Sequence, residues 1–185
     1  LPELAELKAL VTPGTKMICL NNPNNPTGAL MSEAQLQQIV DIARSVDAYI
    51  LCDEVYRHLT QTDDWCPSIA DLYEKGISVS SMSKVFSLAG LRLGWIATRD
   101  AAALKAFLSH RDYNLISCGL FDDAAASVAL AHRDVMLRRN QTIVRENLAI
   151  LDAWVDEHEH FYYTKPNAGT TALVYYDYDI PSYEF

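Results

Sequence analysis

The sequence predicts an α/β fold in which short apolar strands alternate with helices around an open sheet. Half of the 185 residues are apolar, which is enough to bury a substantial core. Strand-like apolar runs alternate along the chain with segments whose apolar residues recur at helical spacing. The strand-like runs in the first half end in polar residues, and ligands of open α/β sheets bind at that end of the strands.

The first unit of the chain is a helix, strand, loop, helix and strand, expected at residues 1–10, 16–21, 22–28, 33–46 and 48–52. Two prolines and a glycine exclude helix and sheet from the loop and make it stiff. Ser32 and Gln35 have the spacing of a capping box, which starts the second helix. We expect Cys19 and Cys52 to fill the core, because both lie inside apolar strand patterns.

An acidic group follows directly after the second strand. The run 48–52 is almost entirely apolar, as expected for a parallel strand covered on both faces, and it ends at Asp53. Asp53 can cap the next helix or serve a functional site, and the residues alone leave both possibilities open. Glu54 is expected to be structural or exposed. The segment 63–68, which contains Trp65, is interpreted as a loop.

A lysine that follows one of the predicted strands is the main candidate for a functional residue. The strand expected at 77–80 stops at the polar residues 81–83, so Lys84 leaves the sheet at a strand end. Arg92 follows between two glycines, which allow close approach of backbone or ligand. We therefore expect a lysine, two serines and an arginine to converge at one edge of the sheet.

The second half of the chain predicts one more strand of this sheet, three helices and the start of a second unit. The strand is expected at 93–98, the helices after Asp100, at 122–132 and at 134–158, and further strands at 161–163 and 171–177. The long helix has a broad apolar band, which suits a helix that packs against two separate parts of the protein. His158 and His160 resemble metal ligands, but at a helix end they are interpreted as a solvated tip, and no metal site is expected.

Charge and composition exclude several classes of protein. The net charge of −9 argues against binding to nucleic acid or to anionic membranes. No apolar run approaches the roughly 20 residues that span a bilayer. The four cysteines form no CxxC pair, so neither a zinc site nor a disulfide framework is suggested, and a cytoplasmic location is expected. The chain starts without Met and stops within a strand-like run, so we interpret it as a piece of a longer protein.

Three segments together resemble the pyridoxal-phosphate aminotransferases of fold type I, class I/II. They are Asn-Pro-x-Asn-Pro-Thr-Gly at 22–28, Asp-Glu-x-Tyr at 53–56, and Ser-x-Ser-Lys followed by Arg-x-Gly at 81–94. In that family the lysine forms a Schiff base with the cofactor, a role that falls to Lys84. The motifs are specific, and the resemblance extends over nearly the whole chain.

The resemblance also assigns the other cofactor contacts. Ser81 and Arg92 hold the phosphate, and Ser83 belongs to the same cofactor-binding segment. Asn25 and Tyr56 reach the phenolic oxygen. Asp53 pairs with the pyridine nitrogen, where a carboxylate at ~4 Å offers about 4 kcal/mol of attraction at an effective dielectric constant near 20. Lys84, Asp53 and Tyr56 are thereby the expected catalytic residues.

The fold implied by the resemblance is a three-layer α/β sandwich. Residues 1–133 would form the second half of the large, cofactor-binding domain, 134–160 an interdomain helix, and 161–185 the truncated start of a small α+β domain. The strand at 93–98 is expected to run antiparallel to its neighbours. The family's glycine-rich phosphate loop, stacking aromatic residue and carboxylate-binding arginine are not found in these residues. A homodimer is expected.

The activity implied is transfer of an amino group between an L-amino acid and a 2-oxo acid, with pyridoxal 5'-phosphate as the cofactor. Two alternatives share the same cofactor site: a lyase that acts at Cβ of an amino acid, and a cofactor-binding regulatory domain. The residues separate these alternatives poorly and leave the substrate open. The 185 residues by themselves are expected to be inactive.

Overall fold

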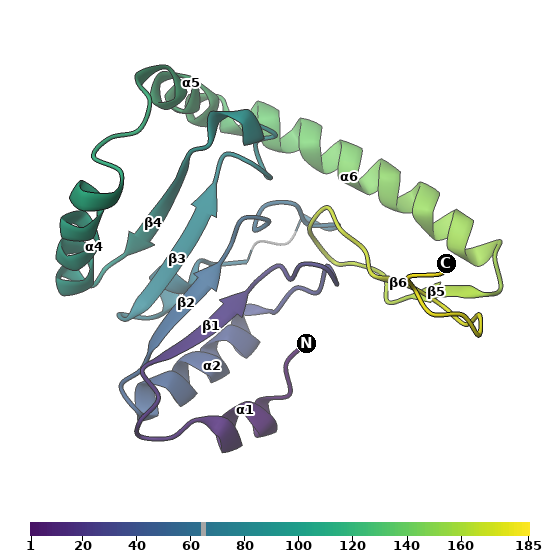
Figure 1. The fold of residues 1–185 in the computed structure, drawn as a ribbon, viewed down its shortest axis with the longest axis horizontal. Coiled ribbons are helices and arrows are strands. Elements are labelled where there is room, and N and C mark those ends of the chain that lie inside the picture. Colours follow the sequence, from purple (N-terminus) through teal and green to yellow (C-terminus); the bar gives the residue numbers. More distant parts are fainter. Residues whose placement is uncertain (64–65) are drawn as a thin grey trace.

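A four-stranded sheet forms the centre of the computed structural model, which describes residues 1–63 and 66–185 (Figure 1). Its strands lie in the order β1 (Met17–Asn21), β2 (Tyr49–Asp53), β3 (Gly76–Ser81) and β4 (Gly94–Thr98). The first three strands are parallel, and β4 pairs antiparallel with β3. The predicted α/β class and the antiparallel last strand are confirmed.

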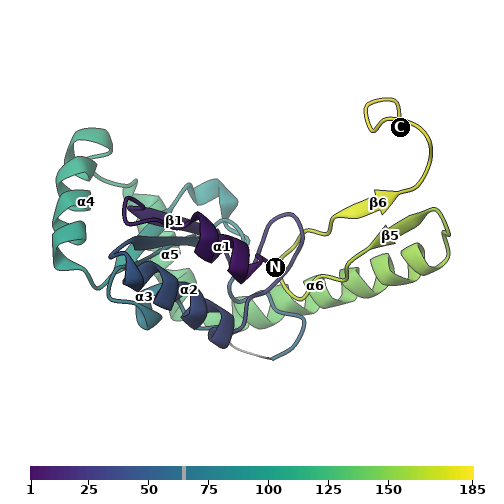
Figure 2. The same cartoon turned by 90° about the horizontal axis from the view of Figure 1, so that it is seen from below.

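Six helices and one 3-10 turn accompany this sheet in the described residues. They are α1 (Leu4–Leu10), α2 (Glu33–Ser45), α3 (Ile69–Leu72), the 3-10 turn η1 (Ala89–Leu91), α4 (Ala101–Asn114), α5 (Leu120–Ala131) and α6 (Arg133–Asp156). Figure 2 shows α4 at one end of the molecule and the small sheet of β5 (Phe161–Tyr163) and β6 (Val174–Tyr176) at the other, beside α6. β6 is therefore shorter than the strand that the sequence predicts at 171–177.

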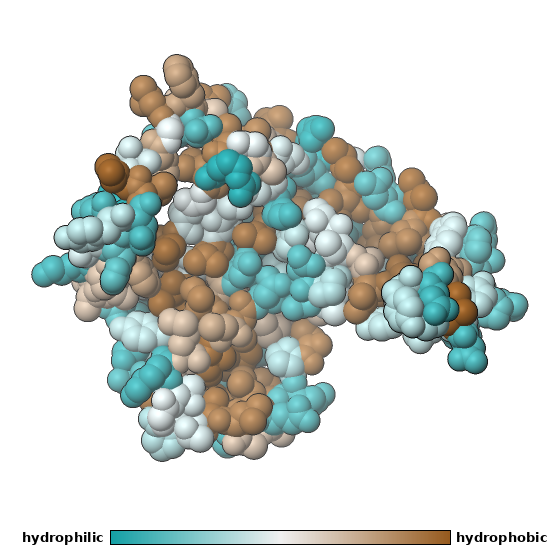
Figure 3. All heavy atoms as spheres, in the orientation of Figure 1, coloured by the Kyte–Doolittle hydropathy of each residue, from teal (hydrophilic) through white to brown (hydrophobic). Residues whose placement is uncertain are grey.

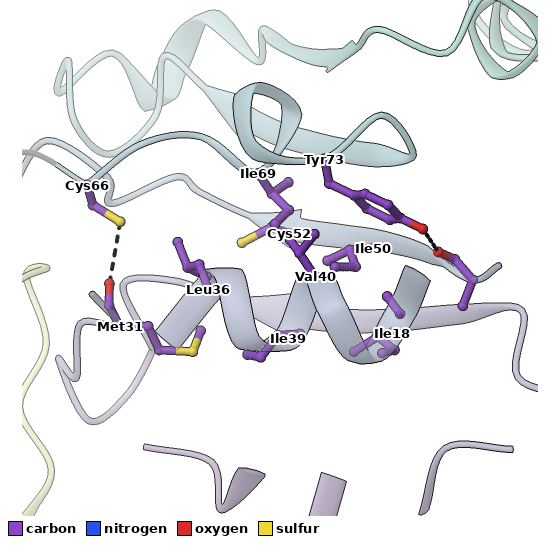
Figure 4. Packing of buried hydrophobic residues seen from close by; sticks show 12 residues of the cluster. Ile18, Met31, Leu36, Ile39, Val40, Ile50, Cys52, Cys66, Ile69 and Tyr73 are labelled. Atoms are coloured by element: carbon purple, nitrogen blue, oxygen red, sulfur yellow. Dashed lines mark hydrogen bonds between the residues drawn. The ribbon is translucent and has the colours of Figure 1, made fainter. Parts of the chain in front are cut away.

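The main core lies between α2 and the sheet. The predicted capping box starts α2, because the Ser32 hydroxyl accepts from the Gln35 N–H while the Gln35 side chain accepts from the Ser32 N–H. The helix then turns its apolar face, which bears Leu36, Ile39 and Val40, towards β1 and β2, where Ile50 of β2 joins the same cluster (Figure 4). All four side chains are fully or almost fully buried. Burying each such side chain contributes about 1.5–3 kcal/mol.

The opposite face of the sheet is open. Strand register places Met17, Cys19, Leu51 and Ile96 on it, and Met17 and Ile96 are 43% and 50% exposed. Figure 3 shows apolar side chains over the sheet on this side of the molecule. Two predictions are therefore wrong: Cys19 is exposed, and the strand at 48–52 is covered on one face rather than two, because helices pack on one side of β1 and β2. Cys52 is buried as predicted.

The predicted long helix is confirmed as α6, and its apolar residues Met136, Leu137 and Val144 pack against a second core cluster that contains Tyr56 and Phe86.

Within the described residues, no group of His, Cys, Asp or Glu side chains could hold a metal ion. None of the helices in the described residues combines the length and the apolarity that crossing a membrane requires. Of the predicted loop at 63–68, residues 64 and 65 lie outside the described part of the chain.

After α6 the chain turns at an exposed tip. His158 stacks on Trp154 with ring centroids 4.4 Å apart, and His160 Nδ1 lies 2.8 Å from Asp177 Oδ1. Both histidines are exposed, in agreement with the predicted solvated tip.

Candidate active site

The register of the sheet aligns polar side chains at the carboxyl ends of the strands. Asn21 pairs with Asp53, Asp53 with Val79, and Ser81 with Gly94. Residues opposite each other, and residues two apart along a strand, point to the same face. Asn21, Asp53 and Ser81 thus share the open face at one edge of the sheet, where α/β proteins bind ligands.

The Asn-Pro loop is tied to the end of β2. The Asn25 N–H donates to Asn21 Oδ1 at 2.6 Å, and Asn21 Nδ2 donates to the Asp53 carbonyl at 3.2 Å. Asn22 is buried; its Oδ1 accepts from the Met31 N–H at 2.8 Å. Sequence reasoning missed Asn21 and Asn22, although two consecutive asparagines at a strand end are a signal for such hydrogen bonds.

Gly28 attaches the same loop to the far end of the chain. A Cβ on Gly28 would lie 2.4 Å from Pro166 Cβ, and its φ of 66° is in the left-handed region that glycine tolerates. Its carbonyl accepts from the N–H groups of Asn167 at 2.9 Å and Ala168 at 3.0 Å. A residue other than glycine would separate these two segments.

Asp53 makes a capping bond, which is one of the two possibilities that the sequence left open, and keeps one oxygen for the other. Its Oδ1 accepts from the Val55 N–H at 3.0 Å, so one oxygen caps the turn after β2. Within the described residues its second oxygen, Oδ2, has no hydrogen-bond partner. This half-buried carboxylate can therefore keep its structural bond and still accept from a cationic group on a ligand.

Glu54 is structural and buried, with 4% of its surface exposed. It accepts from the Ile69 N–H at 2.7 Å, the Ser68 hydroxyl at 3.1 Å and the Arg57 guanidinium at 3.2 Å. These bonds connect the segment after β2 to the first turn of α3. The sequence pattern left its role between structural and exposed, and the tertiary structure decides it.

Lys84 extends over the ring of Tyr56. The lysine Nζ lies 5.9 Å from the ring centroid, which is within the range of a cation–π contact. Tyr56 is buried, whereas Lys84 is exposed. In the described part of the chain no carboxylate pairs with the Lys84 amine, so the amine is available to a ligand.

The hydroxyl segment and Arg92 are on adjacent backbone. The Ser83 N–H donates to Ser81 Oγ at 3.2 Å, and the Met82 N–H donates to the Leu93 carbonyl at 3.0 Å. The approach is close, because a Cβ on Gly94 would lie 2.7 Å from the Ser80 carbonyl oxygen. This pairing places the predicted serines next to the turn that carries Arg92.

Arg92 itself has a left-handed backbone, with φ 50° and ψ 33°. A non-glycine residue in this region costs about 1–3 kcal/mol, and such residues cluster at functional sites. Its guanidinium donates to the Ala89 carbonyl at 2.8 Å. Within the described residues its other N–H groups have no partner, which leaves them free to bind an anion.

Two thiols behind the site stay protonated at neutral pH. Burial raises the pKa of the Cys52 thiol well above its usual range. Burial also raises the pKa of Cys66, against the lowering effect of the hydrogen bond from Asn22. Neither cysteine therefore has the properties of a nucleophile.

Comparison with known proteins identifies the family. The sequence model described as "Aminotransferase class I and II" matches residues 3–177. The chain is 37% identical over 128 residues to aromatic-amino-acid aminotransferase 2 of Thermococcus litoralis, and 36% identical over 128 residues to an aspartate aminotransferase of Pyrococcus abyssi. Each alignment covers 68% of this chain and 33% of the relative.

A solved structure gives the same result. The PLP-dependent aminotransferase from Streptococcus suis superposes with a TM-score of 0.95 and 46% identity, over 100% of this chain and 48% of that protein. The chain therefore belongs to the class I and II aminotransferases, with the fold type I architecture. It spans about a third of the length of the two curated relatives and about half of the solved chain.

Proposed function

We propose that the chain is the lysine-bearing part of an aminotransferase that moves an amino group between an L-amino acid and a 2-oxo acid. The main support is the alignment of Asp53 and Ser81 on one open sheet edge, followed by a loop with a lysine whose amine pairs with no carboxylate of the described residues. The family match and the names of the relatives favour transfer over lyase chemistry or a regulatory role.

The donor set fits pyridoxal phosphate. The free oxygen of Asp53 suits a protonated ring nitrogen, and the unpaired N–H groups of Arg92 suit a phosphate, with Ser81 and Ser83 beside them. Asn25 and Tyr56 would hold the phenolic oxygen. When bound, this cofactor withdraws electrons from the substrate Cα.

Lys84 would provide the proton transfer. Its amine would first hold the cofactor and then, once released, take a proton from Cα of the amino donor and deliver it to C4′ of the cofactor. A lysine suits both tasks because its amine is a nucleophile and, when neutral, a base. Asp53 would stabilise positive charge on the ring nitrogen throughout, and Arg92 would fix the orientation.

We further propose the domain boundaries at 1–133, 134–160 and 161–185, in which α6 is the connection between a large and a small domain. The separate small sheet at the far end of α6 supports this division. A homodimer in the cytoplasm completes the proposal. The four free cysteines suit a reducing compartment.

The experiment is Lys84→Ala in the full-length protein, with Lys105→Ala on α4 as the matched control. We expect the Lys84 variant to lose covalent attachment of pyridoxal phosphate, measured by mass spectrometry after borohydride reduction. Transamination of an amino-donor panel with 2-oxoglutarate and pyruvate should disappear in parallel. Attachment that survives in the Lys84 variant would contradict the assignment, and release of ammonia from the donors would indicate a lyase.

A further inference from the structure

A cavity of about 280 Å³ opens beside Lys84. Its walls come from four regions: the segment at Leu59 and Gln61, the turn at Lys84 and Ser87, one face of α6, and the segment 166–172 that precedes β6. The proposed reactive lysine is therefore one wall of a preformed space that none of its proposed cofactor partners (Asn25, Asp53, Tyr56, Ser81, Ser83 and Arg92) lines.

The walls are held in place by buried hydrogen bonds. Asn140, at 5% exposure, donates from Nδ2 to the Val85 carbonyl at 2.8 Å and fixes α6 against the segment after Lys84. On the other side the Gly169 N–H donates to the Leu59 carbonyl at 2.7 Å. The distance between the lysine and the opposite wall is thus set by the fold, as in ligand sites that are largely preformed.

The lining of the cavity is largely apolar and carries little charge. Its apolar lining residues include Leu59, Ile143, Val144, Leu148 and Leu151, and Lys84 is the single charged residue that lines it in the described part of the chain. A carboxylate that entered would lose water and meet no opposite charge except the lysine that the reaction itself uses. An ammonium group that entered would lose water and meet no opposite charge in the lining.

One polar atom in the lining is unsatisfied. The Thr171 hydroxyl oxygen is buried and has no hydrogen-bond partner among the described residues. Buried polar atoms without a partner are rare in folded proteins, and a bound ligand is one way to satisfy them. Asn147 adds an uncharged amide to the same cavity. A neutral polar group on a ligand could bind here, whereas an ionic group would lack a counter-charge.

The size restricts the occupant further. Pockets for drug-sized ligands range over about 300–1,000 Å³, so 280 Å³ suits a single side chain. We propose that this cavity receives the side chain of the amino donor and selects uncharged, medium-sized side chains such as leucine or methionine over aspartate and glutamate. This inference depends on the proposed aminotransferase function. Similarity does not decide the point, because the relatives are named for aromatic amino acids and for aspartate.

The first test fills the cavity in the full-length protein with Ile143→Trp. Ile150→Trp is the matched control, because Ile150 is on the same helix, is 69% exposed and does not line the cavity. We expect kcat/KM for leucine to fall about 10- to 200-fold in the Ile143 variant, mainly through KM, and alanine to be almost unaffected. Equal losses for leucine and alanine, or no loss for leucine, would overturn the proposal.

The second test adds a cation with Asn147→Arg. Thr142→Arg is the control, since Thr142 is on the same helix, lies outside the cavity and receives the same change of charge. We expect the ratio of kcat/KM for aspartate to that for leucine to rise about 10-fold or more in the Asn147 variant alone. An unchanged ratio, or the same change in both variants, would contradict the assignment.

A binding measurement separates this inference from the proposed function. Calorimetric titration with 4-methyl-2-oxopentanoate and oxaloacetate needs no turnover, and we expect the first to bind more tightly until Ile143→Trp removes the difference. If the unmodified protein transaminates no amino acid but shows this binding pattern, the proposed function fails, and what remains is a cavity that prefers uncharged side chains without the role of an amino-donor pocket. If it transaminates amino acids but neither variant changes the preference, the cavity assignment fails alone.

Discussion

Single side chains in the site each have a structural bond and a free group. Asp53 caps the turn after β2 with one oxygen, and Arg92 binds its own turn through one N–H. The remaining oxygen and N–H groups are held at fixed positions without a partner in the described residues. The local bonds orient these groups before any ligand arrives, which reduces the entropy lost on binding.

Asp53→Asn should preserve the fold and remove the charge. The amide oxygen of Asn can still accept from the Val55 N–H, so circular dichroism and thermal midpoint should hardly change. Loss of about 4 kcal/mol of attraction for the ring nitrogen should reduce kcat about 1,000-fold at saturating cofactor. Asp71→Asn, at an exposed position, is the control. Near-normal turnover in the Asp53 variant would leave Asp53 as a cap only.

Arg92→Ala should mainly weaken the affinity for the cofactor. A hydrogen bond to a charged group is worth about 1.5–3 kcal/mol, so the Kd for pyridoxal phosphate should rise by about 10- to 150-fold. Arg99→Ala is the control, because Arg99 donates to the Asp71 carbonyl beyond the opposite end of β4. Fluorescence titration of the apo-protein measures both. An unchanged Kd would remove Arg92 from the phosphate site.

At the level of elements, α3 and β2 depend on one buried carboxylate. Glu54 connects the turn after β2 to the first turn of α3, where negative charge is favourable at the helix N-terminus. The exposed ion pair Arg44–Glu74 joins α2 to the turn after α3, and its N–O distance of 2.8 Å is shorter than the 3.2 Å of the Arg57–Glu54 pair. Arg44 also holds the pKa of Glu74 at about 2. Solvent screening nevertheless makes the exposed pair the weaker contribution to stability.

Glu54→Gln should therefore destabilise the protein by about 3 kcal/mol, because the buried carboxylate loses its charge and the amide nitrogen that replaces Oε2 cannot accept from the half-buried Arg57 guanidinium. The urea midpoint of the full-length protein gives the measurement. Glu74→Gln, which removes a charge from an exposed pair, should shift the midpoint far less. Equal shifts would show that burial does not control the strength of these pairs.

The whole molecule combines one covered sheet face with one open face. The open face bears Met17, Leu51 and Ile96, and in the described residues β1 and β4 each pair on one side only. Apolar faces and unpaired strand edges of this kind promote association. The aligned site residues lie on the same open face, so whatever covers this face also affects the site.

A polypeptide of residues 1–185 alone should self-associate and show little or no transaminase activity. Sedimentation velocity at micromolar concentration should show species larger than the monomer. Ile96→Glu should reduce the association because it places a charge on the open face. Leu10→Glu should not, because Leu10 is exposed on α1 at the covered side. A fully active monomer would show that this face needs no cover.

The local features of this protein were determined by its sequence. Prolines and glycine in the 22–28 loop, the Ser32 capping box and the apolar periods predict the strands and helices, because these depend on residues close together in the chain. The three motifs also predict the family, which the comparisons confirm. Tertiary structure alone decided the burial of Glu54, the exposure of Cys19 and the cavity between Lys84, α6 and 166–172. These depend on which distant segments pack together, and local residue patterns carry no record of that packing.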